Sequence, residues 1–171
     1  MSRLQHCGIL FLATVGWAMV VGRGAAIAPE IKDEGKFFSP AAVKKANEQI
    51  REIARKHDVD LLIETYSSAP PNELEKLKKG SPQDRGKFFK TWAAERAHEL
   101  AVRGIYILIC KEPGHLQVEI TPKLRGVLDS GFQDKLGEAL LEDFRKKQYD
   151  QALQAAVRIV SEKLGAGAAA K

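Results

Sequence analysis

The sequence predicts an α/β fold: a small mixed sheet with helices on both faces, arranged in three layers. The first observation is periodicity. Four stretches repeat apolar residues at three- and four-residue spacing, as amphipathic helices do, and three short runs rich in branched and aromatic residues are typical of strands. The second is their order: helix, strand, helix, strand, strand, helix, helix. The strand–helix–strand unit predicts a right-handed crossover between parallel strands, and the last two strands predict an antiparallel hairpin.

The first predicted helix begins at Ser39-Pro40, because serine is a good N-cap and proline fits the first helical position. Its apolar stripe continues to about residue 57. Residues 59–66 are then short, branched and aromatic, which predicts a strand. We expect this strand to end in a loop that contains Ser67 and Ser68.

The second predicted helix begins at Ser81-Pro82, which repeats the start signal of the first. Its apolar stripe includes Trp92 and Arg96, and we expect Trp92 to belong to the core. A glycine often follows the last turn of a helix. We therefore expect Gly104 to close this one.

The predicted hairpin consists of residues 105–110 and 116–121. Between them, Pro113 and Gly114 suit the two central positions of a type II turn. Cys110 ends the first of these strands, and we expect a buried core thiol rather than a nucleophile there.

Two helices close the chain. One is expected from about Ser130, with Gln133 three residues later as a capping box, and the other spans residues 148–164. We expect residues 165–171, rich in glycine and alanine, to form a flexible tail.

The first 28 residues have the order of a signal peptide: Arg3, an apolar run over residues 8–21, and then small residues up to Ala28. The apolar run is shorter than the roughly 20 residues needed to cross a bilayer, which argues against a permanent membrane helix. We expect an exported protein, periplasmic or extracellular, cleaved after Ala28 or Ala26.

Composition limits the remainder of the chain to one domain, expected at residues 29–164 of the 171. With 44% hydrophobic and 29% charged residues, the chain lies outside the range of intrinsically disordered proteins. Loss of Arg3 and Arg23 with the signal would reduce the formal charge from +5 to +3. So small a charge does not favour nucleic acid as a partner.

Taken in order, these features resemble the TPM domain, a family that includes a thylakoid-lumen acid phosphatase, a photosystem II repair protein and many bacterial exported proteins. The resemblance covers about residues 33 to 164. Its pieces are Asp33 ahead of the Ser39 cap, the strand 59–66, Trp92 ahead of residues 104–109, the strand 116–121 and the closing stretch 144–153. One departure is residues 121–125, Thr-Pro-Lys-Leu-Arg, where the family usually has a glycine-rich stretch.

Both Ser-Pro helix starts are expected at the carboxyl edge of the first strand, where helix N-termini could hold an anion such as phosphate. Carboxylates at that edge suit Ca²⁺ or Mg²⁺. The candidate metal ligands are Asp33 and Asp84, with Glu34 nearby, and the candidate ligand-binding residues are Ser39, Ser67 and Ser68. The alternative is that Asp33 and Asp84 are acids that complement helix dipoles.

Glu64 and Glu119 lie inside predicted strands, where a charged side chain is unusual if both faces of the sheet are covered. Each is either a functional carboxylate or an acid that is solvated or paired with a lysine. The four histidines lack zinc-binding spacing; we expect His98 to face water and His115 to lie in a turn. A basic cluster is expected to face solvent or, alternatively, an acidic partner: Lys76, Lys78, Lys79, Arg85, Lys87 and Lys90.

Two functions follow as hypotheses. The first is an interaction module for assembly or quality control in the cell envelope, with an envelope protein as its partner. No recognisable pair of nucleophile and base is present, and this favours binding over catalysis. The second, implied only by the resemblance, is an acid phosphatase that depends on a divalent metal.

Overall fold

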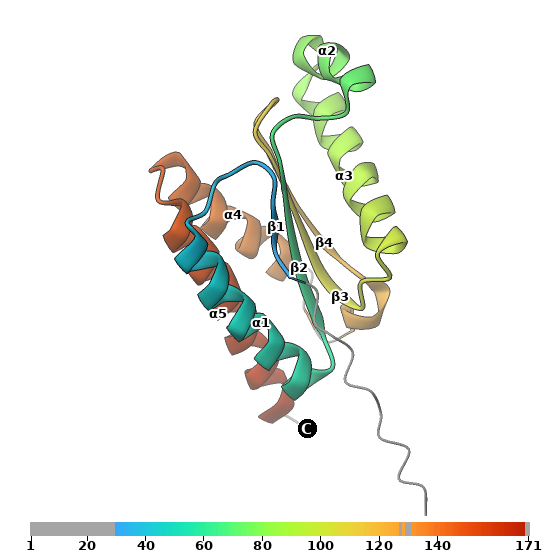
Figure 1. The fold of residues 1–171 in the computed structure, drawn as a ribbon. Coiled ribbons are helices and arrows are strands. Elements are labelled where there is room, and N and C mark those ends of the chain that lie inside the picture. Colours follow the sequence, from blue (N-terminus) through green and yellow to red (C-terminus); the bar gives the residue numbers. More distant parts are fainter. Residues whose placement is uncertain (1–29, 127, 129–130, 170–171) are drawn as a thin grey trace, which may run out of the picture.

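Four strands form one mixed sheet in the computed structural model, which describes residues 30–126, 128 and 131–169 (Figure 1). Strands β1, β2 and β3 are parallel, and β4 is antiparallel to β3, so the predicted crossover and hairpin are both confirmed. The bounds in sheet order are β1 Lys32–Asp33, β2 Asp60–Tyr66, β3 Gly104–Cys110 and β4 His115–Ile120. Strand β1 was not predicted, because two residues carry no periodicity.

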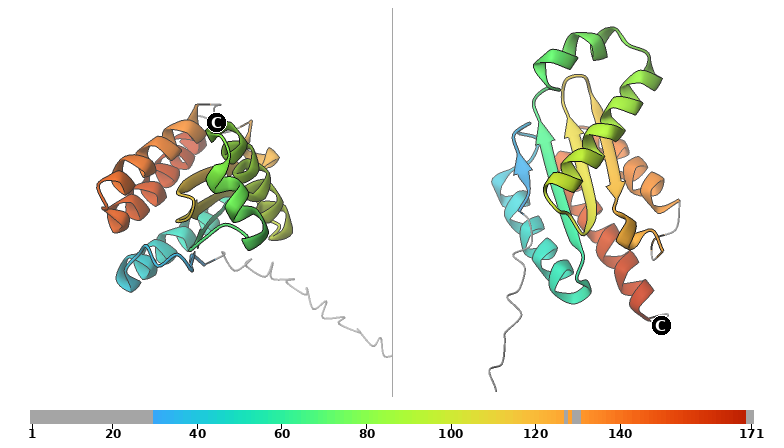
Figure 2. Two further views of the ribbon diagram at one scale, coloured as in Figure 1. Left: turned by 90° about the horizontal axis from the view of Figure 1, so that it is seen from above. Right: turned by 90° about the vertical axis from the view of Figure 1, so that its right-hand side faces the viewer.

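Helices cover both faces of this sheet, as the three-layer prediction requires. In the right-hand view of Figure 2, α3 crosses in front of the sheet while α1, α4 and α5 lie behind it. The bounds are α1 Pro40–His57, α2 Pro71–Lys79, α3 Pro82–Glu99, α4 Phe132–Arg145 and α5 Tyr149–Ala169, with a short 3-10 helix at Pro122–Leu124. Helix α2 was not predicted, because its nine residues are mostly polar and only Leu77 is buried.

The core has two parts, one on each face of the sheet. Alternate residues of β3 point to opposite faces: Ile105 and Ile107 pack with α1, α4 and α5, whereas Tyr106 and Cys110 pack with α3. Every residue of β3 is buried, which explains its continuous apolar run. Cys110 is 2% exposed, so the prediction of a buried thiol is confirmed.

Both predicted helix starts are confirmed. The hydroxyl of Ser39 accepts a hydrogen bond from the backbone N–H of Ala42, and Ser81 forms a capping box with Asp84. Both helices run downward in Figure 1 from the side on which β2 ends, as expected, with α3 starting near the top and α1 at about mid-height, and they lie on opposite faces of the sheet.

The end of α3 corrects the role given to Gly104. The helix ends at Glu99, and Ala101, with φ of 49°, takes the left-handed position that follows it. The N–H of Val102 bonds to the carbonyl of Ala97, which completes a Schellman motif. Gly104 instead begins β3.

Three smaller expectations also differ. Gly114 lacks the positive φ that a type II turn requires at that position. Helix α4 begins at Phe132, and Gln133 donates to the carbonyl of Val118 rather than capping the helix; Ser130 lies outside the described residues. Helix α5 continues to Ala169, beyond the expected end at 164, because alanine favours helix strongly enough to carry it past Gly165.

No described helix is long and apolar enough to cross a membrane. The predicted signal peptide, residues 1–28, lies outside the part of the chain that the structure describes.

Candidate functional site

Asp33 organises the loop that joins β1 to α1. Its Oδ1 accepts hydrogen bonds from Thr65 Oγ1 at 2.6 Å and from the N–H of Phe37 at 3.1 Å, and its Oδ2 accepts from the N–H of Phe38 at 2.9 Å. Thr65 Oγ1 in turn accepts from the N–H of Gly35 at 2.8 Å. Asp33 therefore ties the loop to the carboxyl end of β2.

Oxygen atoms of other predicted site residues lie close by. Ser67 Oγ donates to the carbonyl of Glu34 at 3.0 Å, so these two residues share the edge with Asp33. Ser68 follows Ser67 and is partly exposed. The Ser39 hydroxyl is committed to capping α1, and the Ser39 N–H donates to Asp150 Oδ1 at 2.8 Å.

Asp84 serves as a cap on the other face of the sheet. Its Oδ2 accepts from Ser81 Oγ at 2.7 Å and from the Ser81 N–H at 3.3 Å. These hydrogen bonds lower the pKa of Asp84. The structure does not bring Asp84 together with Asp33 and Ser67, since α3 and α1 cover opposite faces. Within the described ranges, no group of three or more His, Cys, Asp or Glu residues is placed to hold a metal ion.

Glu64 is the centre of a buried polar network. Its carboxylate is 3% exposed, and Oε1 accepts from Lys32 Nζ at 2.9 Å and from Arg96 Nη2 at 3.1 Å. Oε2 accepts from the hydroxyls of Tyr66 at 2.7 Å and Tyr106 at 2.8 Å. The expected pairing with a lysine is confirmed. Sequence reasoning missed the partners Arg96, Tyr66 and Tyr106, although an arginine on the apolar stripe of a helix was a usable signal.

This network holds Glu64 ionised. Burial, the largest single influence, raises the pKa of the carboxyl group, but the hydrogen bonds from Tyr66, Lys32 and Tyr106 and the charge of Arg96 outweigh it. The resulting pKa lies below the ordinary 4.5. Burial and the bond to Glu64 also raise the pKa of Tyr66 to about 12, so its hydroxyl stays protonated.

A pocket of about 250 Å³ opens beside Glu64 on the α3 face. Its lining residues are Lys32, Glu34, Glu64, Thr65, Tyr66, Trp92 and Arg96. Trp92 packs 4.7 Å from the ring of Tyr66 and is only partly buried, so it forms a wall of the pocket rather than the middle of the core; Phe89 occupies that place. Arg96 also bonds to Glu99 at 2.8 Å. The cations of the pocket are thus neutralised, and it offers little attraction to a phosphate.

Two other groups of the α3 face are poor catalysts. Burial raises the pKa of the Cys110 thiol to about 11, so the nucleophilic thiolate does not form at neutral pH. His115 begins β4 rather than lying in a turn, and its ring stacks on Phe89 with 4.2 Å between centroids. Burial lowers the pKa of His115, and the charge of Arg85 adds to this effect.

His115 should make the domain less stable in mild acid. Unfolded histidine titrates near 6.5, whereas the folded His115 takes up its proton only at lower pH. As pH falls below 6.5, the unfolded state binds the extra proton first. The free energy of unfolding should then decrease by at most about 1.4 kcal/mol per pH unit. Urea titrations of wild type and His115→Gln measure this.

The exposed His98 provides the matched control, and its expected orientation toward water is confirmed. His98→Gln should keep the wild-type loss of stability below pH 6.5, and His115→Gln should lose part of it. Identical pH profiles for all three proteins would contradict the assignment.

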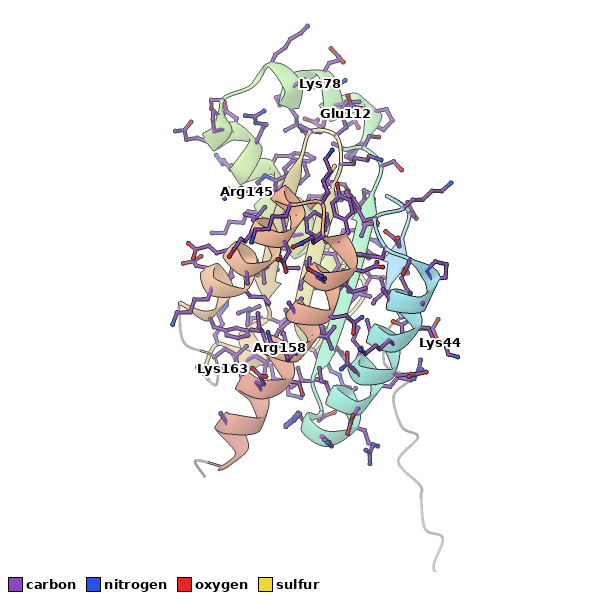
Figure 3. The ribbon with its side chains drawn as sticks, turned by 90° about the vertical axis from the view of Figure 1, so that its left-hand side faces the viewer. Lys44, Lys78, Glu112, Arg145, Arg158 and Lys163 are labelled. Atoms are coloured by element: carbon purple, nitrogen blue, oxygen red, sulfur yellow. The ribbon has the colours of Figure 1, made fainter. Side chains whose placement is uncertain are left out.

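Glu119 and the basic cluster are the remaining charged candidates. Glu119 is paired, but with Arg125 at 3.3 Å rather than with a lysine. In the basic cluster, Lys78 pairs with Glu112 at 2.9 Å near the top of Figure 3. Lys76, Lys79, Lys87 and Lys90 are exposed, as expected for a solvent-facing surface.

Comparisons with known proteins identify a family from the sequence and a shared fold from solved structures. A family model described as the TPM domain matches residues 31–163. The N-terminal domain of a P. gingivalis protein is similar at 18% identity, with a TM-score of 0.62 over 78% of this chain and 80% of that one. The BA42 protein of Bizionia argentinensis is 14% identical, with a TM-score of 0.57 over 77% and 84% of the two chains.

A third structure, the N-terminal domain of the cg2496 protein of Corynebacterium glutamicum, is 8% identical, with a TM-score of 0.56 over 91% of this chain and 86% of that one. At these identities the three structures establish the fold alone. No curated protein sequence gives a significant match.

Proposed function

The chain belongs to the TPM domain family, and on that premise we propose that it is an exported interaction module that serves assembly or quality control in the cell envelope. One observation carries the proposal: three of the candidate acids, Asp33, Asp84 and Glu64, are committed to holding the fold. Both carboxylate oxygens of Asp33 accept hydrogen bonds from backbone N–H groups or a hydroxyl, Asp84 caps a helix, and Glu64 is neutralised by two cations.

Capture from the cell envelope tests this proposal. Full-length chain with a C-terminal tag, purified from the envelope fraction of its source cells, should retain a defined envelope protein after stringent washing. The same preparation should release no phosphate from a chromogenic phosphate monoester, with or without Ca²⁺ or Mg²⁺. If a metal ion stimulates hydrolysis and no envelope protein is retained, the proposed function is wrong and the protein is a phosphatase.

The second candidate is a phosphatase that uses a divalent metal, and one observation favours it. Hard oxygen atoms of Asp33, Thr65, Ser67 and the Glu34 carbonyl gather at one sheet edge. Ca²⁺ and Mg²⁺ prefer such carboxylate, carbonyl and hydroxyl oxygens. The oxygen atoms at this edge are therefore of the type that a divalent cation binds, and Asp33 would be its charged ligand.

Calcium should raise the melting temperature if Asp33 holds it. A ligand that binds only the folded state stabilises it by RT ln(1 + [L]/Kd), about 2.7 kcal/mol at a concentration of 100 Kd. Asp33→Asn should reduce the calcium-dependent shift. The variant should also melt lower without the ion, since an amide has one acceptor oxygen for three donors.

Asp84→Asn is the matched control, because it removes an equal charge from a helix cap on the other face. It should keep the wild-type calcium shift. Calorimetry in chelator and in excess calcium measures all three proteins, and a flat wild-type response would end the metal hypothesis.

A further inference from the structure

A cluster of aromatic rings lies at the same end of the molecule as the Asp33 loop. Phe37 packs 5.3 Å from Phe144 and 5.4 Å from Tyr149, and the last two rings are 5.1 Å apart. These three rings are only partly buried. Beside them, a groove of about 430 Å³ runs between residues 37–39 and 147–151. We call this the aromatic groove.

Four basic residues lie in or beside the aromatic groove. Lys147 lines it, and Lys111 Nζ lies 5.9 Å from the centre of the Phe37 ring. Lys36 precedes Phe37 in the chain, and Arg145 follows Phe144 as the last residue of α4. Figure 3 labels Arg145 at the end of α4. All four are exposed, and within the described part of the chain none of them forms an ion pair. The carboxylate in the groove, Asp150, accepts from the Ser39 N–H.

Two of these lysines occupy backbone positions that favour glycine. Lys36 has φ of 53° and Lys147 has φ of 58°, both left-handed. Side chains with a Cβ adopt this region at a cost that glycine avoids. Asp58 and Ala101 adopt the same conformation where α1 and α3 end, and Lys147 likewise follows the cap of α4, so glycine can replace either lysine without disturbing the turn.

The shape of the surface favours a protein segment over a lipid surface. Membrane insertion needs protruding apolar side chains, but Leu141 is the only large hydrophobic exposed among the described residues, at 37%. The rings here pack on one another and leave a groove. A groove admits a side chain that protrudes from a partner.

We propose that the aromatic groove binds an acidic segment of a partner protein that carries an aromatic side chain. The ring of the partner packs against Phe37 and Tyr149, and its carboxylates face Lys36, Lys111, Arg145 and Lys147. This proposal rests on the proposed function as an interaction module and assigns its contact surface and the chemistry of its partner.

The test uses the full chain and three short fluorescent peptides: acidic with one tryptophan, acidic without it, and basic with it. Fluorescence anisotropy should show binding of the first peptide only, weaker at physiological than at low ionic strength. The double variant Lys36→Gly/Lys147→Gly should bind about tenfold more weakly, since each exposed charge contributes a few-fold. Its melting temperature should equal or exceed that of wild type, because glycine relieves both backbone positions.

Lys87→Gln/Lys90→Gln is the control, because it removes two equal charges from α3 and should bind like wild type. Phe37→Leu should weaken binding while the chain stays folded. The proposal is overturned if the double glycine variant binds as tightly as wild type, or if anionic phosphatidylglycerol vesicles are bound and the peptide is not. If the double glycine variant retains an envelope protein as well as wild type does, the aromatic groove is not the binding surface, but the proposed function as an interaction module stands.

Discussion

Replacing Glu64 with alanine should lower the free energy of unfolding by about 3 kcal/mol. Removing one partner of a buried ion pair typically costs about 3 to 5 kcal/mol, because the other charge loses its compensation. Here the lower end applies, since the side chains of Lys32 and Arg96 are 52% and 27% exposed and can turn to water. The hydroxyl of the buried Tyr106 would lose its acceptor as well.

Urea unfolding of wild type and Glu64→Ala measures this loss. Glu119→Ala is the control: the Glu119 side chain is 12% exposed, but its partner Arg125 is 65% exposed and can turn to water, so the loss should be smaller, about 1 kcal/mol. The pH dependence gives a second measurement. The pKa of Glu64 is lowered in the folded state, so its contribution is present above the ordinary 4.5 and is lost as pH falls through the folded value. Equal midpoints for the two variants would show that the network is not stabilising.

The layers of the fold could be predicted from the sequence because each depends on local signals. The two Ser-Pro starts, the apolar stripes and the strand–helix–strand order all act over a few turns, and the structure confirms them. Strand β1, helix α2 and the 3-10 helix at Pro122–Leu124 were missed, because they are short or mostly exposed and carry little local signal.

The candidate site was predictable only in part. Asp33 and Ser67 lie at the expected edge because parallel strands end there together. The Glu64 network depends instead on strand register. Glu64 pairs with Leu108 of β3, which places Tyr106, two residues earlier, on the same face, and Arg96 reaches Glu64 from α3. Periodicity shows that a residue faces inward but not which distant residue it meets.

Gly104 shows how the same residue type can be given the wrong role. A glycine after a helix commonly takes the left-handed closing position, yet Ala101 holds that position here. Gly104 is needed for a different reason, the close approach of β3 to the start of β2, which only the paired strands reveal.

Replacing Gly104 with alanine should therefore destabilise the domain strongly. The added Cβ would overlap the carbonyl oxygen of Asp60 and would lie 2.8 Å from its nitrogen, and both atoms belong to backbone that a side-chain rotation cannot move. Overpacking of this kind costs typically about 1 to 3 kcal/mol, and more where the neighbour cannot yield. We expect the free energy of unfolding to fall by at least about 3 kcal/mol, because β3 must shift away from β2 and carry Tyr106 away from Glu64.

Gly86→Ala is the matched control. Nothing lies within 4 Å of its added Cβ inside α3, so the same change should raise the free energy of unfolding by up to about 1 kcal/mol. Urea midpoints should move in opposite directions for the two variants, and a Gly104→Ala midpoint at or above that of wild type would contradict the close approach of the two strands.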